Sequence, residues 1–294
     1  MARTHPTQVV EVRRRRSLLT PALRLVRWEN CLFAWAAAVV GFASAATPHQ
    51  PGWRLVVAGL VVALVLGFGN VVNDVFDEDA DTRSKPWRPL PSGRIRRGEA
   101  IGLSVWLAVV AVLAAAPLGA VPLLIAVVML GLAHAYSARL KRIPLLGNLS
   151  VALQVGSTIF FGALCAGHPT AVTVDASVVV AMHSLTLEVA KTVEDKDADG
   201  AVGMTTLAHV VDRTKQGALV LVLAVLSGAA AIAFGVVRDA PPGYWLVLAP
   251  LVPLIWLSLR WQAEPTDLPA PIAVFLRASK ALWCLALLGL TMLS

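Results

Sequence analysis

Charged side chains are scarce in this chain, because Asp, Glu, Lys and Arg together make up 15% of its 294 residues. Soluble domains carry about 25%. Hydrophobic residues account for 57% of the chain and the mean hydropathy is +0.72, so the composition excludes a soluble globular domain. The apolar runs are continuous and do not alternate with polar residues, which excludes a transmembrane β-barrel. An α-helical membrane protein is the class that fits.

Cysteine is also rare. The three cysteines, Cys31, Cys165 and Cys284, stand far apart, each within an apolar run. This spacing offers neither a pair of metal ligands nor a redox pair. The cysteines therefore give no indication of function.

Long apolar runs recur along the chain and are separated by polar loops. A helix of about 20 apolar residues crosses the hydrocarbon core of a bilayer. Nine runs approach or reach that length, so we expect an all-α integral membrane protein with nine transmembrane helices. The predicted spans are Cys31–Thr47, Trp53–Val72, Ala100–Leu118, Val121–Tyr136, Leu146–Gly167, Ala171–Lys191, Gln216–Val237, Tyr244–Arg260 and Pro271–Leu293.

The net charge of +7 is compatible with nucleic-acid binding, but the positions of the basic residues favour a topology signal. With a cytoplasmic N-terminus, all 25 Lys and Arg fall on the cytoplasmic side except Arg54, Arg238, Arg277 and Lys280. We therefore expect a multi-pass protein of the cell (plasma) membrane with no nucleic-acid partner. Residues 1–23 are predicted to form a basic cytoplasmic tail facing anionic lipid, and residues 24–294 a single transmembrane domain.

The acidic residues are unevenly distributed. Ten of the 18 Asp and Glu fall in two short windows, at the predicted cytoplasmic ends of the second and sixth spans. Carboxylates crowded at the end of a membrane helix repel one another and are costly near lipid, so they indicate a bound cation. Solvated acidic loops are the alternative interpretation. The windows contain Asp74, Asp77, Glu78, Asp79 and Asp81, and Glu188, Glu194, Asp195, Asp197 and Asp199.

The spacing within these windows predicts a metal site. Asn73, Asp77 and Asp81 stand at i, i+4 and i+8 with no helix breaker between them, so an unbroken helix would place them on one face. Asp195 and Asp199 repeat the i, i+4 spacing. Oxygen ligands of this kind suit Mg²⁺, which binds through one or two carboxylates together with substrate phosphates.

Cationic side chains lie close to the acids in the sequence. Arg88 belongs to a proline-stiffened loop directly after the first window, and Lys141 follows the fourth predicted span. Such cations can hold a phosphate. Arg277 and Lys280 stand at i, i+3 in the last span, where snorkelling, an internal salt bridge and ligand contact are all open. A divalent metal, clustered cations and an apolar interior together indicate an amphiphilic substrate with a phosphorylated head.

These motifs resemble those of the UbiA superfamily of intramembrane prenyltransferases. The family's Asn-x-x-x-Asp-x-x-x-Asp motif stands at Asn73, Asp77 and Asp81, and its Asp-x-x-x-Asp motif at Asp195 and Asp199. The family's Arg-Pro-Leu-Pro-Ser-Gly loop stands at residues 88–93. The resemblance extends over nearly the whole chain.

Two shorter segments are similar to family motifs with small departures. Tyr136 and Lys141 resemble a Tyr and a Lys that follow the fourth helix, with one extra residue between them. Arg27 and Asn30 resemble an Arg-Pro-x-Asn segment before the first helix, with Trp28 in place of the proline. The loop sequences are most similar to those of members that prenylate glycerol-phosphate lipids.

The resemblance implies nine helices around a central apolar cavity, with the Asp-rich motifs on the cytoplasmic side. Mg²⁺ at these motifs would bind an isoprenyl diphosphate whose chain lies in the cavity. The implied metal ligands are Asn73, Asp77, Asp81, Asp195 and Asp199, of which the four aspartates are the expected catalytic residues. The implied substrate-binding residues are Arg27, Asn30, Asn73, Arg88, Tyr136 and Lys141.

We therefore expect a Mg²⁺-dependent prenyltransferase that moves a prenyl group from an isoprenyl diphosphate to an unidentified aromatic or lipid-like acceptor. Diphosphate is released, membrane lipid surrounds the chain, and no obligate protein partner is expected. Gln154 and Glu188 are candidates for the acceptor side, with Glu188 as a general base. A UbiA-type terpene cyclase would use the same metal site and is the main alternative. A divalent-cation carrier is a further alternative.

Overall fold

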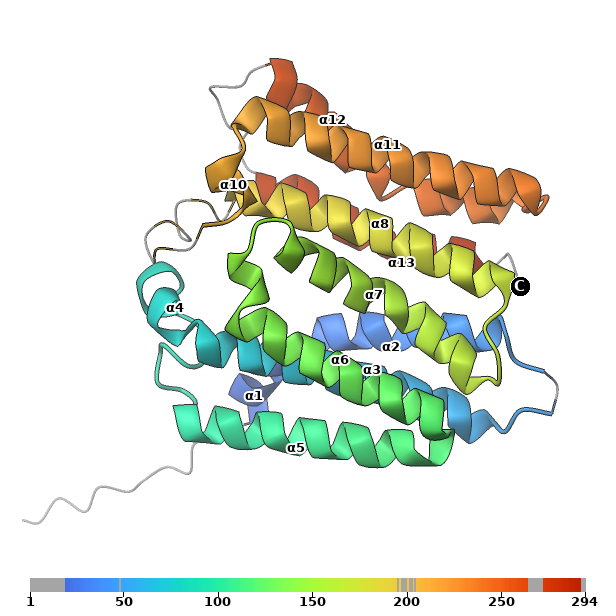
Figure 1. Ribbon diagram of the computed structural model, residues 1–294, viewed down its shortest axis with the longest axis horizontal. Coiled ribbons are helices and arrows are strands. Elements are labelled where there is room, and N and C mark those ends of the chain that lie inside the picture. The colour runs from blue at the N-terminus through green and yellow to red at the C-terminus, as the bar shows by residue number, and fades with distance from the viewer. Residues whose placement is uncertain are drawn as a thin grey trace, which may run out of the picture.

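The computed structural model describes residues 19–47, 49–194, 205–263 and 272–291, together with residues 196, 200 and 203. Within these residues the regular structure is entirely helical, which confirms the predicted all-α class (Figure 1). The α-helices are α1 (Leu19–Val26), α2 (Trp28–Ala43), α3 (Gly52–Phe76), α4 (Glu78–Ser84), α5 (Arg97–Ala115), α6 (Ala120–Ala138), α7 (Leu146–Cys165), α8 (Ala171–Glu194), α10 (Leu207–Val210), α11 (Arg213–Val237), α12 (Leu251–Ala263) and α13 (Ile272–Thr291). The 3₁₀ helices are η1 (Ala116–Leu118), η2 (Leu140–Arg142) and η3 (Pro242–Leu248).

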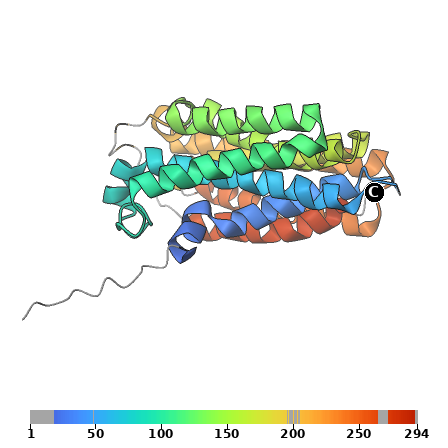
Figure 2. The same ribbon diagram turned by 90° about the horizontal axis from the view of Figure 1, so that it is seen from below.

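The long helices lie side by side in one bundle, with their axes along a common direction (Figures 1 and 2). The short helices α4 and α10 gather at one end, which we call the motif end because the first Asp-rich window lies there. The opposite end is the far end. Most of the predicted basic tail, residues 1–18, lies outside the described residues, while residues 19–23 belong to α1.

Within the described residues, seven helices are long and apolar enough to cross a membrane, or eight if the bent pair α1 and α2 counts as one span. This pair bends by 53° around Arg27. Helix α13 corresponds to the ninth predicted run but is not among these candidates, so the number nine stays a prediction. The multi-pass architecture is confirmed.

Most of the apolar surface of the outer helices is not buried inside the bundle. In α6 only 22% of the most apolar window is buried inside the bundle, and in α11 only 28%. Large aliphatic side chains such as Leu124 and Val128 on α6 are more than half exposed. Because backbone groups inside a helix are already hydrogen-bonded, such surfaces are suited to lipid.

Helices α2 and α7 pack at very short range near their C-terminal ends. A Cβ atom added at Gly162 of α7 would lie 1.9 Å from the carbonyl oxygen of Ala38 in α2. A Cβ atom at Gly41 of α2 would lie 2.0 Å from the carbonyl oxygen of Ile159. Small residues permit this approach, which is how membrane helices commonly pack.

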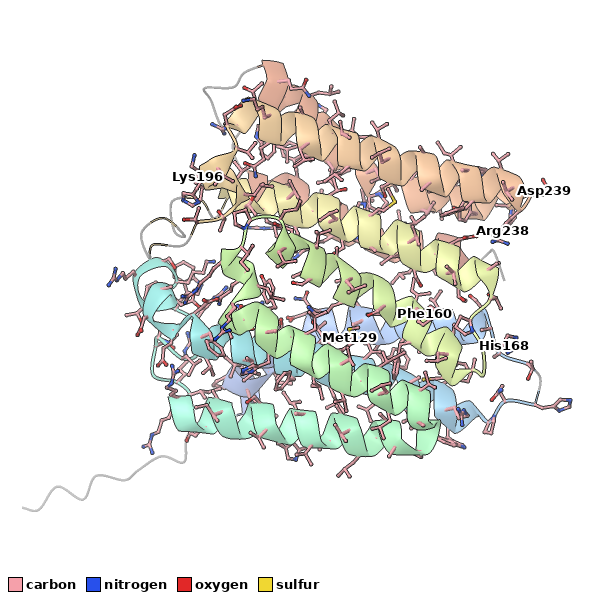
Figure 3. All side chains as sticks on the ribbon, in the orientation of Figure 1. Met129, Phe160, His168, Lys196, Arg238 and Asp239 are labelled. Atoms are coloured by element: carbon pink, nitrogen blue, oxygen red, sulfur yellow. The ribbon has the colours of Figure 1, made fainter. Side chains whose placement is uncertain are left out.

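Arginines tie the far end together. Arg54 donates from Nε to the carbonyl oxygen of Cys165 at 3.0 Å and from Nη2 to that of Leu118 at 2.8 Å. It therefore satisfies carbonyls at the ends of two other helices. Arg238, labelled at that end in Figure 3, donates from Nε to Asp175 at 2.8 Å. These two arginines are the ones that the sequence places outside the cytoplasmic side.

Two predicted helices are interrupted. The expectation of an unbroken helix through Asp77 is wrong, because α3 ends at Phe76 and α4 begins at Glu78. Asp77 has φ −96° and ψ 4°, yet its NH still bonds to Asn73 at 2.9 Å, so the break only bends the chain. The predicted span Tyr244–Arg260 is divided between η3 and α12. Proline rings and missing NH groups near residue 250 disfavour a continuous α-helix there.

The close crossing of α2 and α7 predicts a strong effect of one added methyl group. We expect Gly162→Ala to lower the unfolding temperature of the detergent-solubilised protein by about 5 °C, because backbone atoms must separate. Gly131→Ala on α6 is the matched control, since nothing lies within 4 Å of its Cβ position. Equal unfolding temperatures for the two variants would contradict the described crossing.

Candidate active site

A cavity of about 590 Å³ opens at the motif end and extends between the helices. Its wall includes the described residues that the sequence singles out for metal or substrate binding. These are Arg27, Asn30, Asn73, Asp77, Asp81, Arg88, Tyr136 and Lys141. Asp195 and Asp199, from the second Asp-rich motif, lie outside the described residues, so their predicted roles stay predictions.

The first motif forms one wall, which we call the acid wall. Asn73, Asp77 and Asp81 all line the cavity despite the bend at Asp77. Lys141 reaches them from η2, with Nζ 2.5 Å from Asp77 Oδ1 and 3.4 Å from Asn73 Oδ1. Its side chain is only 9% exposed.

Close packing sets the position of Lys141. A Cβ atom at Gly147, at the start of α7, would lie 2.9 Å from the Cα atom of Lys141. Only glycine permits the chain to return so closely over η2. The lysine backbone is thereby held against the helix that forms the neighbouring part of the cavity wall.

The proline-rich loop delivers Arg88 to the same wall. Its Nη1 lies 2.5 Å from Asp81 Oδ2 and 3.3 Å from Asp74 Oδ1. Asp74 and Asp81 are both 4% exposed, so these carboxylates would be costly without a cationic partner. Arg88 therefore belongs to the site through two aspartates of the same motif segment.

Arg27 approaches the motif from the bend between α1 and α2. It has a left-handed backbone, with φ 56°, which bends the chain by 53° between the two helices. Its Nη2 lies 2.7 Å from Asp74 Oδ1, and its Nη1 donates to Asn70 Oδ1 at 3.3 Å. Asn70 in turn donates to the carbonyl oxygen of Val26 at 2.8 Å. Asn70 therefore bonds both to the side chain of Arg27 and to the backbone of the residue before it, which holds the left-handed conformation in place.

Asp74 and Asn70 are functional-site neighbours that the sequence analysis did not select. Asn70 and Asp74 stand at i and i+4, as Asn73 and Asp77 do, but three residues earlier, so they lie on an adjacent face of the same helix. This repeated Asn-x-x-x-Asp spacing is the sequence signal that could have identified the pair. Asn70 lines the cavity and Asp74 does not; both bond to Arg27, and Asp74 also pairs with Arg88. Three carboxylates of the motif therefore share three cations.

The donor atoms of the acid wall fit a hard divalent cation. It offers one amide and two carboxylate side chains, and Mg²⁺ binds through one or two carboxylates while keeping water or phosphate oxygens as its other ligands. Among the described residues, which leave out the second motif, no three His, Cys, Asp or Glu side chains gather into a complete metal site. The described residues thus offer an incomplete set of ligands, and a contribution from Asp195 and Asp199 stays a prediction.

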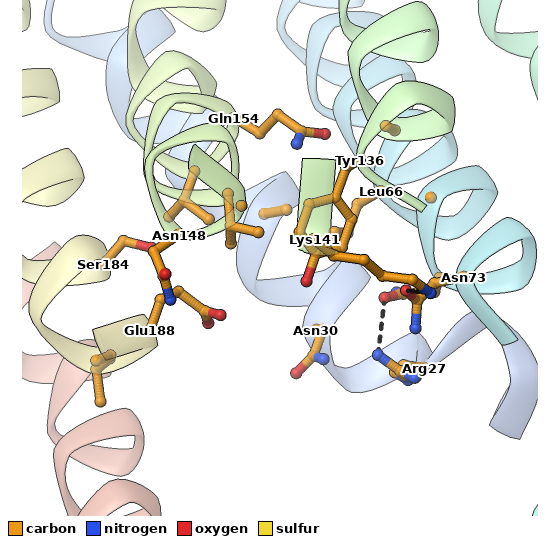
Figure 4. A pocket seen from close by; sticks show the side chains of 18 of the residues that line it. Arg27, Asn30, Leu66, Asn73, Tyr136, Lys141, Asn148, Gln154, Ser184 and Glu188 are labelled. Atoms are coloured by element: carbon orange, nitrogen blue, oxygen red, sulfur yellow. Dashed lines mark hydrogen bonds between the residues drawn. The ribbon is translucent and has the colours of Figure 1, made fainter. Parts of the chain in front are cut away.

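A second polar wall faces the acid wall across the cavity, and we call it the opposite wall. Figure 4 shows Asn148, Ser184 and Glu188 on the side away from Asn73 and Lys141, with Glu188 directed into the cavity. Glu188 forms an ion pair with Lys191, one turn further along α8. The polar members of this wall are Asn148, Gln154, Ser184, Glu188, Lys191, Thr192 and Lys280.

Beyond the two polar walls the cavity becomes apolar. Val61, Val62, Ile125, Ala126 and Phe161 line it. Val61 lies 16 residues before Asp77 in the chain, and Gly52–Phe76 is one helix, so these side chains stand about 24 Å from the acids along α3. The cavity can therefore hold a long apolar chain whose polar head stays at the motif end.

Comparison with known families identifies similar proteins over most of the chain. The model of the UbiA prenyltransferase family matches residues 34–292. Digeranylgeranylglyceryl phosphate synthase of Methanothrix thermoacetophila is 34% identical over 207 residues, which are 69% of this chain and 77% of that protein. The enzyme of the same name from Methanosarcina mazei is 34% identical over 223 residues, covering 71% and 76% of the two chains.

Solved structures share the fold. One, from work on digeranylgeranylglyceryl phosphate synthase in membranes, has a TM-score of 0.74 at 24% identity and covers 93% of this chain and 97% of that one. A UbiA homolog from Archaeoglobus fulgidus bound to GPP and Mg²⁺ has a TM-score of 0.71 at 18% identity, covering 93% and 99%. At these identities the likeness concerns the arrangement of helices.

The position of Lys141 predicts a specific role in anion binding. We expect Lys141→Gln to weaken binding of inorganic pyrophosphate, in the presence of Mg²⁺, by about tenfold, because a charged hydrogen-bond donor is lost. Titration calorimetry on the detergent-solubilised protein measures this. Arg142→Gln is the matched control, since Arg142 is the next residue, is exposed and does not line the cavity. Equal weakening in both variants would point to overall charge and contradict the local assignment.

Proposed function

The chain belongs to the UbiA prenyltransferase family, and from this premise we propose that it transfers a prenyl group from an isoprenyl diphosphate to a hydroxyl of a glycerol-phosphate lipid. One observation carries the proposal: a single cavity joins an acid wall with cations, an apolar interior and a separate polar wall. The acceptor class follows the names of the curated relatives, which are digeranylgeranylglyceryl phosphate synthases.

The acid wall is proposed to bind the diphosphate head of the donor. Asn73, Asp77 and Asp81 would hold Mg²⁺ together with Asp195 and Asp199 from the second motif. Bound Mg²⁺ would supply positive charge to the departing diphosphate. Arg88 and Lys141, which now pair with Asp81 and Asp77, would turn to phosphate oxygens once the metal ions occupy the carboxylates.

The apolar interior is proposed to hold the prenyl chain and to exclude water. An allylic cation reacts with any water that it meets, so a dry cavity protects the intended reaction. Arg27, Asn30 and Tyr136 line the polar part and would orient the head group. A chain lying beside Val61 and Phe161 would leave its allylic carbon between the two polar walls.

Transfer needs a base for the acceptor. The bond between the allylic carbon and the diphosphate oxygen breaks, and its electron pair leaves with diphosphate. The acceptor oxygen forms the new bond to this carbon and gives up its proton. Glu188 is the proposed proton acceptor, because its carboxylate is directed into the cavity from the opposite wall.

We place the protein in the cell membrane with the motif end toward the cytoplasm. Arg88 and Lys141 lie at the motif end, whereas Arg54 and Arg238 lie at the far end, in line with the excess of basic residues expected inside. Residues 1–23 are proposed to form a basic tail on that side, followed by one transmembrane domain.

The proposed reaction is tested with purified protein in lipid nanodiscs, Mg²⁺, geranylgeranyl diphosphate and geranylgeranylglyceryl phosphate. We expect pyrophosphate release and a doubly alkylated lipid only when both substrates are present.

Asp77→Asn should reduce turnover by about 100-fold or more, because a proposed metal ligand is lost. Asp79→Asn, at an exposed position outside the cavity lining, is the matched control and should keep wild-type turnover. A cyclic hydrocarbon formed from the diphosphate alone would overturn the transferase assignment in favour of a cyclase.

The role of Glu188 has its own test. We expect Glu188→Gln to lower kcat by about 100-fold or more while leaving donor binding unchanged, because the base is lost but the acid wall is intact. Glu188→Asp keeps a carboxylate and should retain more activity than Glu188→Gln. Single-turnover kinetics with both variants gives the comparison. Wild-type kcat in Glu188→Gln would remove Glu188 from the mechanism.

A further inference from the structure

Gln216 is a buried polar residue at the start of α11. It is 1% exposed and does not line the cavity. The next residue, Gly217, packs against Trp261 of α12, which belongs to an apolar cluster together with Val189 and Val220. An amide buried in such surroundings costs free energy unless its polar atoms are hydrogen-bonded. None of the steps described above uses Gln216, so its bonding partners indicate its role.

The side-chain amide of Gln216 bonds to two atoms of α8. Its Nε2 donates to the carbonyl oxygen of Val189 at 3.0 Å and to Thr192 Oγ1 at 2.5 Å. Thr192 Oγ1 itself donates to the Val189 carbonyl oxygen at 2.8 Å, so three polar atoms form a closed triangle. A carbonyl oxygen can only accept, which identifies the nitrogen as the amide atom that faces α8. The amide thus uses both of its hydrogens on one neighbouring helix.

The triangle lies where α8 ends and α11 begins. Val189 and Thr192 belong to the last two turns of α8, and Gln216 belongs to the first turn of α11. Asp212 caps that first turn, because its side chain accepts a hydrogen bond from the NH of Lys215 at 3.0 Å. The last turn of a helix has carbonyl groups without partners inside the helix, and helix ends open more readily than helix interiors. Gln216 therefore ties the end of α8 to a capped helix.

The same part of α8 contributes to the opposite wall. Glu188 and Thr192 stand at i and i+4 and both line the cavity, whereas Val189 is 0% exposed and belongs to the cluster shared with α11 and α12. A rotation of α8 about its axis would turn Glu188 away from the cavity, and the two bonds from Gln216 oppose this rotation. The ion pair of Glu188 with Lys191 cannot oppose it, because both residues belong to α8 and would rotate together.

We propose that Gln216 is a positioning residue, which keeps Glu188 directed into the cavity by fixing the last turns of α8 against α11. The assignment rests on the proposed function, because that function makes Glu188 the proton acceptor. Misplacing a reacting group by about 1 Å can lower a rate by about 100-fold. A residue outside the cavity can therefore control the transfer step without contact with either substrate.

The test begins with Gln216→Leu, which keeps a similar volume and suits the apolar cluster. Thr192 and the Val189 carbonyl keep their bond to each other, so the unfolding temperature should change little. We expect single-turnover kcat to fall by about tenfold, because Glu188 is less well oriented. Binding of inorganic pyrophosphate with Mg²⁺ should stay unchanged, because the acid wall is formed by other helices.

Ser227→Ala is the matched control. Ser227 is also 1% exposed and lies on α11, but among the described residues its hydroxyl has no hydrogen-bond partner. This variant likewise removes a buried polar group from α11 and should keep the wild-type kcat. A similar loss of kcat in Ser227→Ala would show that α11 tolerates no change of this kind and would overturn the specific role of Gln216.

The decisive measurement repeats Gln216→Leu in the Glu188→Gln background. If Gln216 acts through Glu188, the double variant should have the kcat of Glu188→Gln alone, whereas a general structural defect would lower kcat by the same factor in both backgrounds. Equal factors, a wild-type kcat in Gln216→Leu, or a parallel loss of pyrophosphate affinity would overturn the assignment of Gln216. Failure of the proposed function is a different outcome: the wild type would form no doubly alkylated lipid, or Glu188→Gln would keep the wild-type kcat, and either result would also remove the role of Gln216.

Discussion

A carboxylate at the end of a membrane helix needs a cationic partner, and this requirement organises the motif end of the protein. Asp74, Asp77 and Asp81 come from one short segment, but their partners come from three others: the bend before α2, the loop after α4 and the 3₁₀ turn before α7. Breaking one buried pair leaves an uncompensated charge, which is strongly destabilising. The ion pairs therefore join distant parts of the chain at the polar end of the cavity.

The carboxylates and cations of these ion pairs can exchange partners when a substrate and a metal ion bind. A metal ion and a diphosphate bring charges of both signs, so carboxylates and cations can each find a new partner without a change in net pairing. The bundle behind them is closely packed, because α2 and α7 meet at glycine contacts and Arg54 bonds to two helix ends at the far end. Binding can thus be accommodated by side chains at the mouth of the cavity while the apolar interior keeps its shape.

Sequence reasoning succeeded where local spacing determines geometry. The i, i+4, i+8 pattern placed Asn73, Asp77 and Asp81 on the cavity wall, because helical periodicity survives the small bend at Asp77. Features that depend on tertiary register were not predictable. The bond between Asp74 and Arg27 requires a left-handed residue, for which the sequence carries no glycine as a signal. The place of Lys280 on the opposite wall depends on how α13 is aligned with α8.

The two walls of the cavity are built by different helices, and this has an evolutionary consequence. The acid wall belongs to α3, α4 and η2, whereas the opposite wall belongs to α7, α8 and α13. Under the proposed mechanism, mutations in the second group can alter which nucleophile is accepted while the wall proposed to bind the donor diphosphate stays intact. Descendants of such a scaffold can therefore diversify their products through a few substitutions on one side, each passing through an enzyme that still activates the same allylic substrate.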